Sequence, residues 1–266
     1  MTRSPASAQA QRSAAQQGEL WGAHARDWAE VQEPQFSPLY VAALAAWPFT
    51  GRSLLDVGCG AGGFCALAER SGAQVYGLDA AAELIAVARE RASGAVFCTG
   101  TMEQLPYPDD FFDLVTGFNV VGHSEDSLRA VREVARVART GAHVGLSTWG
   151  RPEACDATAL FAALERLRAP FERSCCQPGR RWGLEEFFDA AGLVGLEREE
   201  VPCPWIYADA DAALRGIMSA GPFVSVARLA GEERLRETLL EALAPFRTND
   251  GYRLQNHFSF LTATVG

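Results

Sequence analysis

The fold is decided by residues 54–64, which read LLDVGCGAGGF. Apolar residues lead into Asp56, four glycines follow within six positions, and an alanine-rich helical run begins after them. In α/β sheets, a buried strand that breaks into glycines and restarts as a helix holds a nucleotide-like ligand, because residues without side chains let the backbone and the helix N-terminus approach it closely. We therefore expect Gly58, Gly60 and Gly62 to form a cofactor-binding loop.

The glycine spacing by itself leaves two cofactor classes open. Gly58, Gly60 and Gly63 also fit the G-x-G-x-x-G pattern of dinucleotide-binding proteins, so an NAD-dependent oxidoreductase is one alternative. Asp56 favours the other class, because a carboxylate two residues before the first glycine suits a cationic amino group better than a pyrophosphate.

Short strands alternate with helices from residue 53 onward, which predicts a parallel sheet with helices on both faces. The expected strands are residues 53–57, 74–78, 95–99, 112–118, 143–148, 196–201 and 258–265, and the helices between them are residues 63–71, 81–92, 125–139 and 182–192.

The chain divides into three parts. Residues 1–18 are low in complexity and lack large apolar side chains, so we expect a solvated tail or a frayed helix. Residues 19–48 are amphipathic and predict an N-terminal helical cap, and residues 49–266 form the main domain. Two stretches, at about residues 150–182 and 205–248, break the alternation, and we expect them to form a helical lid over the substrate mouth. The helices expected in them are residues 154–167, 209–219 and 232–246.

Composition and charge argue against several other classes. The formal net charge is −9, so neither nucleic acid nor an anionic membrane surface is expected as a partner. No apolar run approaches the ~20 residues of a membrane span and no signal core is visible, which predicts a cytoplasmic protein. No cysteine pair has C-x-x-C spacing, so we expect no metal site and interpret Cys175–Cys176 as reduced structural thiols. The chain has no lysine, which excludes a Schiff-base or P-loop lysine.

Asp79 ends the second expected strand, 21 residues after Gly58. A carboxylate at this place accepts the ribose hydroxyls in nucleotide-binding sheets. The alternative is that Asp79 caps the helix that follows.

Two segments resemble the class I S-adenosylmethionine-dependent methyltransferases, in particular small-molecule enzymes of the ubiquinone-biosynthesis type. One is the glycine loop, in which an acid, Asp56, is followed by x-G-x-G; the other is TMEQLPYP at residues 101–108, after the third strand. The resemblance implies a Rossmann-like, doubly wound sheet of seven strands in the order 3-2-1-4-5-7-6, with the last strand inserted antiparallel. It also implies S-adenosylmethionine as cofactor and S-adenosylhomocysteine as product.

The resemblance implies cofactor contacts beyond the glycines. Thr101 stands where the family has an aspartate that contacts the adenine amino group, and Glu103 is the alternative for that contact. Asn119 would border the methionine moiety, and the cluster around Trp28 resembles a helix that closes over the cofactor. The full set of expected cofactor residues is Asp56, Gly58, Gly60, Gly62, Asp79, Ala80, Thr101, Met102, Glu103, Asn119 and Trp28.

His123, after the fourth strand, is the candidate catalytic base. By the resemblance it faces the acceptor, and a histidine with a pKa near neutrality suits removal of a proton from an oxygen acceptor. The alternative is a loop histidine without a catalytic role. Candidate substrate contacts are Trp21, His24, Trp149, Arg181, Trp182 and Asn256.

These observations predict an enzyme that transfers the methyl group of S-adenosylmethionine to a small-molecule acceptor in secondary or cofactor metabolism. Oxygen is favoured over nitrogen or carbon as the methylated atom, and the protein is expected as a monomer or homodimer. Three alternatives stay open: an S-adenosylmethionine-binding cyclase of natural-product biosynthesis that does not methylate, the NAD-dependent oxidoreductase, and a non-catalytic binding module on the same fold.

Overall fold

A computed structural model describes residues 5–171 and 183–266. Its centre is a seven-stranded sheet in the order β3-β2-β1-β4-β5-β10-β6, with β10 antiparallel to both of its neighbours. This confirms the expected topology. The strands are β1 (Ser53–Val57), β2 (Gln74–Asp79), β3 (Val96–Thr99), β4 (Phe112–Phe118), β5 (Ala138–Trp149), β6 (Leu193–Pro202) and β10 (His257–Val265).

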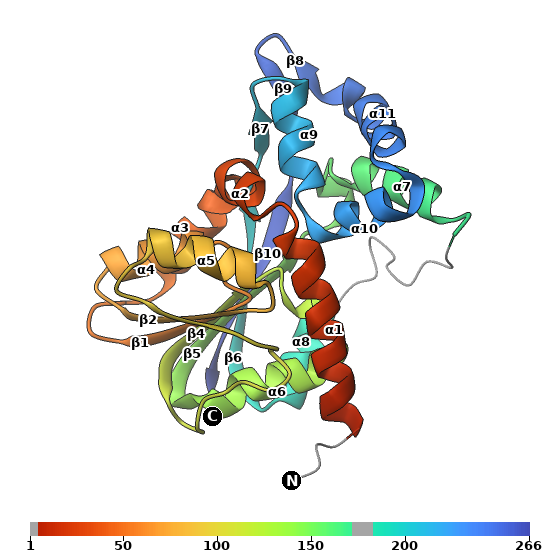
Figure 1. Ribbon diagram of the computed structural model, residues 1–266. Helices are drawn as coiled ribbons and strands as arrows, with labels where there is room; N and C mark the ends of the chain where they lie inside the picture. Colours follow the sequence, from red (N-terminus) through yellow and green to blue (C-terminus); the bar gives the residue numbers. More distant parts are fainter. Residues whose placement is uncertain (1–4, 172–182) are drawn as a thin grey trace.

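Helices cover both faces of the sheet (Figure 1). Strand β1 has buried side chains on each face, as a central parallel strand requires. One face packs against α3 (Ser37–Ala46), α4 (Gly63–Arg70) and α5 (Ala82–Arg91), and the other against α6 (Ser127–Val137) and α8 (Leu184–Ala190). The first turn of α6 is capped by Asp126, whose carboxylate accepts the Arg129 N–H at 3.0 Å.

The two interrupting stretches come together as one extra layer beyond the sheet (Figure 1). Three of the four helices described in it correspond to predicted helices: α7 (Thr158–Arg168), α9 (Ala210–Met218) and α11 (Glu232–Leu243). The fourth, α10 (Gly221–Ala230), was not predicted. A small antiparallel sheet, also not predicted, adds β7 (Trp205–Tyr207), β8 (Arg247–Thr248) and β9 (Gly251–Leu254).

The N-terminal residues are packed, which differs from a solvated tail. Helix α1 spans Pro5–Gly22, and Ala10 is only 2% exposed. A Cβ atom on Gly18 would lie 2.4 Å from the carbonyl oxygen of Ala80, so α1 approaches the turn after β2 more closely than a larger residue allows. Small residues such as Ala10 and Gly18 make these close contacts. Because they are small, the sequence of this segment shows no periodic pattern of large apolar residues, and the packing was not predicted.

Short helical pieces complete the chain. They are α2 (Ala25–Asp27), the π-helical turn η1 (Trp28–Gln32) and the 3₁₀ turns η2 (Glu33–Phe36), η3 (Val121–His123), η4 (Pro152–Ala154) and η5 (Ala244–Phe246). Among the helices of the described residues, none combines the length and the apolar character needed to cross a bilayer.

Candidate functional site

The glycine loop turns sharply between β1 and α4. Gly58, Gly60 and Gly62 have φ values of +68°, +56° and +77°, which side chains disfavour. A Cβ atom on Gly58 would lie 2.2 Å from a methyl group of Val120. The N–H groups of Gly58 and of the residue after it both donate to the carbonyl oxygen of Leu78, which ties the loop to the end of β2.

Asp79 lies at the carboxyl end of β2, directly beside this loop. Its Oδ2 accepts the Gly60 N–H at 2.9 Å, and its Oδ1 accepts the Ala81 N–H at 2.8 Å. Burial raises the pKa of the carboxyl above its ordinary value. The structure thus joins Asp79 to the loop and to the start of α5 at once, and its contact with a ribose stays a prediction.

Asp56 lies beneath the loop. It is 1% exposed, its Oδ1 accepts the Thr116 hydroxyl at 2.8 Å, and its Oδ2 accepts the Cys65 thiol at 3.7 Å. Burial raises the pKa of this carboxyl to about 7. Both carboxylate oxygens are therefore engaged by side chains of the protein, and a contact of Asp56 with an amino group stays a prediction.

A second buried carboxylate, Glu33, reaches the loop from η2 and was not singled out in the sequence. Its Oε1 accepts the Ala61 N–H at 2.9 Å, and its Oε2 pairs with the guanidinium of Arg91 on α5. Arg91 also donates to the carbonyl oxygens of Ala29 and Ala61. Burial raises the pKa of Glu33 to about 7 although Arg91 opposes this shift. No local pattern marks Glu33, because its partners lie far away in the sequence.

Trp28 is placed against the same loop. Its indole N–H is buried and has no hydrogen-bond partner within residues 5–171 and 183–266, and its Nε1 lies 3.3 Å from the position of a Cβ atom on Gly60. The ring packs edge-on against Trp21 of α1, with ring centroids 4.8 Å apart. The N-terminal cap therefore presents an unpaired donor at the predicted cofactor loop.

The segment at residues 101–108 is held firmly after β3. The hydroxyl of Thr101 accepts the Glu103 N–H at 3.3 Å, and Met102 is buried. The carboxylate of Glu103 is buried and accepts the Glu125 N–H at 2.8 Å, so one of its oxygens is already used within the protein. Arg136 of α6 donates to backbone carbonyl oxygens of this segment and thereby fixes it against the sheet.

The end of β4 carries the candidate base. Asn119 has φ +54°, an uncommon value for a residue other than glycine, and its N–H donates to the Ser147 hydroxyl at 3.0 Å. Four residues later, the His123 ring packs edge-on against Trp21 at 5.2 Å between centroids. Burial lowers the pKa of His123 to about 4, so its imidazole is neutral at pH 7. Through Trp21, helix α1 connects this histidine to Trp28.

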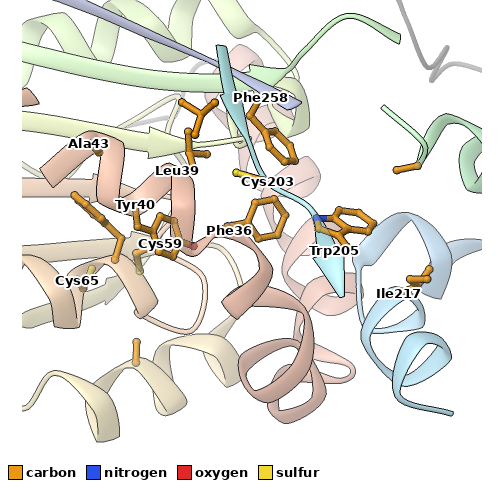
Figure 2. Packing of buried hydrophobic residues seen from close by; sticks show 14 of the residues in the cluster. Phe36, Leu39, Tyr40, Ala43, Cys59, Cys65, Cys203, Trp205, Ile217 and Phe258 are labelled. Atoms are coloured by element: carbon orange, nitrogen blue, oxygen red, sulfur yellow. The ribbon is translucent and has the colours of Figure 1, made fainter. Parts of the chain in front are cut away.

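The candidate substrate residues do not gather at one point. Trp149 packs against Phe258 and Trp205, with ring centroids 4.6 and 5.6 Å away. Figure 2 shows Trp205 and Phe258 facing Phe36 where the extra layer meets the sheet. Asn256 is fully buried and accepts the Ala157 N–H at 3.0 Å, so it supports α7.

The other candidate substrate residues are placed differently. His24 is exposed and lines a hollow together with Met218 and Val224. Arg181 and Trp182 lie outside the described residues, as do Cys175 and Cys176. Among residues 5–171 and 183–266, no three His, Cys, Asp or Glu side chains lie together in a way that could hold a metal ion.

Comparison with known proteins agrees with the topology and the loop. Residues 55–146 match the family model described as a methyltransferase domain. The chain therefore contains a methyltransferase domain. The ubiquinone biosynthesis O-methyltransferase of Sinorhizobium medicae is 35% identical to this chain over 125 residues, which are 46% of the chain and 50% of the relative. The chain thus spans about half the length of curated relatives that it matches.

Two solved structures resemble this chain in fold. The YcgJ protein of Bacillus subtilis superposes with a TM-score of 0.59 at 22% identity, covering 88% of this chain and 99% of that one. The [4+2]-cyclase SpnF superposes with a TM-score of 0.53 at 21% identity, covering 87% of this chain and 82% of that one. At these identities the likeness concerns the fold alone.

Proposed function

We propose that this chain transfers the methyl group of S-adenosylmethionine to a small-molecule acceptor, with oxygen favoured over nitrogen or carbon. The observation that carries the proposal is the glycine loop joined to Asp79 at the carboxyl edge of the sheet, within a domain that matches the methyltransferase model. Ligands of open α/β sheets bind at this edge. The relative that methylates oxygen in ubiquinone biosynthesis supports the preference for oxygen.

The residues at the loop fit such a cofactor. The unpartnered N–H of Trp28 lies beside Gly60, and a carboxylate such as that of a methionine moiety would satisfy this donor. Asp79 would hold the ribose, while Thr101 and Met102 would hold the adenine. The remaining proposed contacts are Ala80, Glu103, Asn119, Gly58 and Gly62, with Asp56 supporting the loop from below.

When bound, S-adenosylmethionine supplies an electrophilic methyl group on a positively charged sulfur. The chain's own residues would align the acceptor with it and exclude water, since such a displacement needs little else from the protein. The aromatic rings of Trp21 and Trp28 would close this space. His123, neutral at pH 7, would take the proton from an acceptor hydroxyl at its free ring nitrogen.

One alternative keeps a specific observation in its favour. The fold shared with a [4+2]-cyclase supports, as a second candidate, an enzyme that binds S-adenosylmethionine without transferring its methyl group.

The methyltransferase proposal includes a small-molecule acceptor, a cytoplasmic location and a role in secondary metabolism. The net charge of −9 supports an acceptor other than nucleic acid.

The test is calorimetric titration of the purified chain with S-adenosylmethionine, S-adenosylhomocysteine and NAD, followed by turnover assays with phenols, carboxylic acids and amines. We expect micromolar binding of both sulfur ligands, no binding of NAD, and release of S-adenosylhomocysteine with a phenolic or carboxylic acceptor. Product formation without S-adenosylhomocysteine release would favour the cyclase. Binding of NAD alone would contradict the proposal and favour an oxidoreductase.

A further inference from the structure

The buried carboxylate of Glu33 occupies the start of helix α4. Glu33 is 2% exposed, and its Oε1 accepts the Ala61 N–H at 2.9 Å. The N–H of Gly63, the first residue of α4, also stabilises the charged form of this carboxylate. A Cβ atom on Gly63 would lie 2.8 Å from Glu33 Oε2, so the carboxylate lies directly against the helix start. Backbone N–H groups at this position are the ones that bind phosphate in dinucleotide-binding sheets.

Arg91 holds this carboxylate in place. Its guanidinium pairs with Glu33 and donates to the carbonyl oxygens of Ala61 and Ala29, so one side chain connects the loop, the N-terminal cap and α5. Above its pKa of about 7, this carboxylate is an anion with a counter-charge and backbone donors of its own, so the titrations that test its role are made at about pH 8.5.

We propose that Glu33 is a specificity-determining residue: its carboxylate fills the anion position at the N-terminus of α4 and so excludes ligands that carry a phosphate there. Two anions about 4 Å apart repel strongly at the effective dielectric of a protein interior. The donors of Ala61 and Gly63 are also already used, so a phosphate would find repulsion and no free N–H. The inference rests on one part of the proposed function, which is that the glycine loop binds a ligand that contains adenosine.

The experiment compares adenosine with ADP, which share the adenosine part and differ in the diphosphate. Calorimetric titrations use the full chain, the variant Glu33→Gln and the control Glu90→Gln. Glu90 precedes Arg91 on α5 and pairs with Arg26 at the surface, so its substitution removes one carboxylate charge without breaking the pair of Glu33 with Arg91. We expect the wild type to bind ADP at least tenfold more weakly than adenosine. Glu33→Gln should reduce this ratio at least fivefold, because Arg91 loses its counter-charge, and Glu90→Gln should leave it unchanged.

Equal wild-type affinities for adenosine and ADP would overturn the proposal without any variant. So would a folded Glu33→Gln protein with the wild-type ratio. Where the single variant does not fold, the double variant Glu33→Gln with Arg91→Gln removes both charges of the pair, and it too should bind ADP better relative to adenosine than the wild type does. S-adenosylhomocysteine is titrated in parallel: its failure to bind while adenosine binds contradicts the proposed function and leaves the adenosine-to-ADP ratio readable.

Discussion

Replacing Asp79 by alanine should weaken cofactor binding, and the hydrogen bonds of Asp79 in the structure limit how large the rise in Kd can be. A carboxylate has about four acceptor sites. The N–H groups of Gly60 and Ala81 use two of them, and the Ala80 N–H also stabilises the charged form. At least one acceptor site therefore remains for a ribose hydroxyl. Loss of such charge-assisted bonds should cost about 1.5–3 kcal/mol of binding free energy, which is roughly a 10- to 150-fold rise in Kd.

The assay is calorimetric titration of Asp79→Ala with S-adenosylhomocysteine, and the control is Asp113→Ala. Asp113 accepts the Ser53 N–H at 2.9 Å and the Ser53 hydroxyl at 2.8 Å at the opposite end of the sheet. Both variants therefore lose buried hydrogen bonds and some stability, but only the first loses a proposed ligand contact. Affinity of the control should stay within about twofold of the wild type, on the order of the error between independent sites.

A second ligand separates ribose binding from loop support. S-adenosylhomocysteine without its ribose 2′-hydroxyl should bind the wild type more weakly than the full ligand, whereas Asp79→Ala should bind both equally. A folded variant that keeps wild-type affinity refutes the ribose role. So does a variant that still distinguishes the two ligands as the wild type does, because its loss of affinity then comes from a distorted loop.

Three further predictions concern turnover, pH dependence and stability. His123→Ala should slow S-adenosylhomocysteine release roughly 10²–10⁴-fold and leave the affinity for the cofactor unchanged. Because burial lowers the pKa of His123 to about 4, the acid limb of the wild-type pH–rate profile should lie near pH 4. An acid limb near pH 6.5 contradicts this assignment. Burial raises the pKa of Asp56 to about 7, so the folded state keeps a proton that the unfolded chain releases above about pH 4, and stability falls as pH rises through 7. In urea unfolding, Asp56→Asn should therefore gain about 2–3 kcal/mol relative to the wild type between pH 5 and pH 8, and a pH-independent difference opposes the assignment. Arg136→Ala should lower the free energy of unfolding by about 1–3 kcal/mol, since Arg136 bonds the carbonyl oxygens of Leu105 and Tyr107, and an unchanged urea midpoint argues against that role.

The sheet and the glycine loop could be predicted because their signals are local. Buried strands give runs of apolar residues, and the φ values at Gly58, Gly60 and Gly62 require glycine, so both features are written in consecutive residues. The order of the strands came from the resemblance, since periodicity alone does not say which strand lies beside which.

Other parts of the site depend on contacts that no local pattern carries. The carboxylate of Glu33 is held by an ion pair with Arg91, and no sequence pattern links these two distant residues. Helix α1 is held through Ala10 and Gly18, and small residues allow close packing without a visible apolar stripe. Strand β8 has two residues, which is too short for an alternation to be seen.

The place of β10 in the sheet has a consequence for synthesis of the chain. Strand β5 ends at residue 149, but its partner β10 begins only at His257. At translation rates of about 5–20 residues per second, β5 is exposed as an open edge for roughly 5–20 seconds before its neighbour is made. An unpaired strand edge of this kind can pair with strands of other chains, so the nascent chain should depend on chaperones to prevent aggregation during this interval. A slower ribosome would lengthen that interval and lower the yield of native protein.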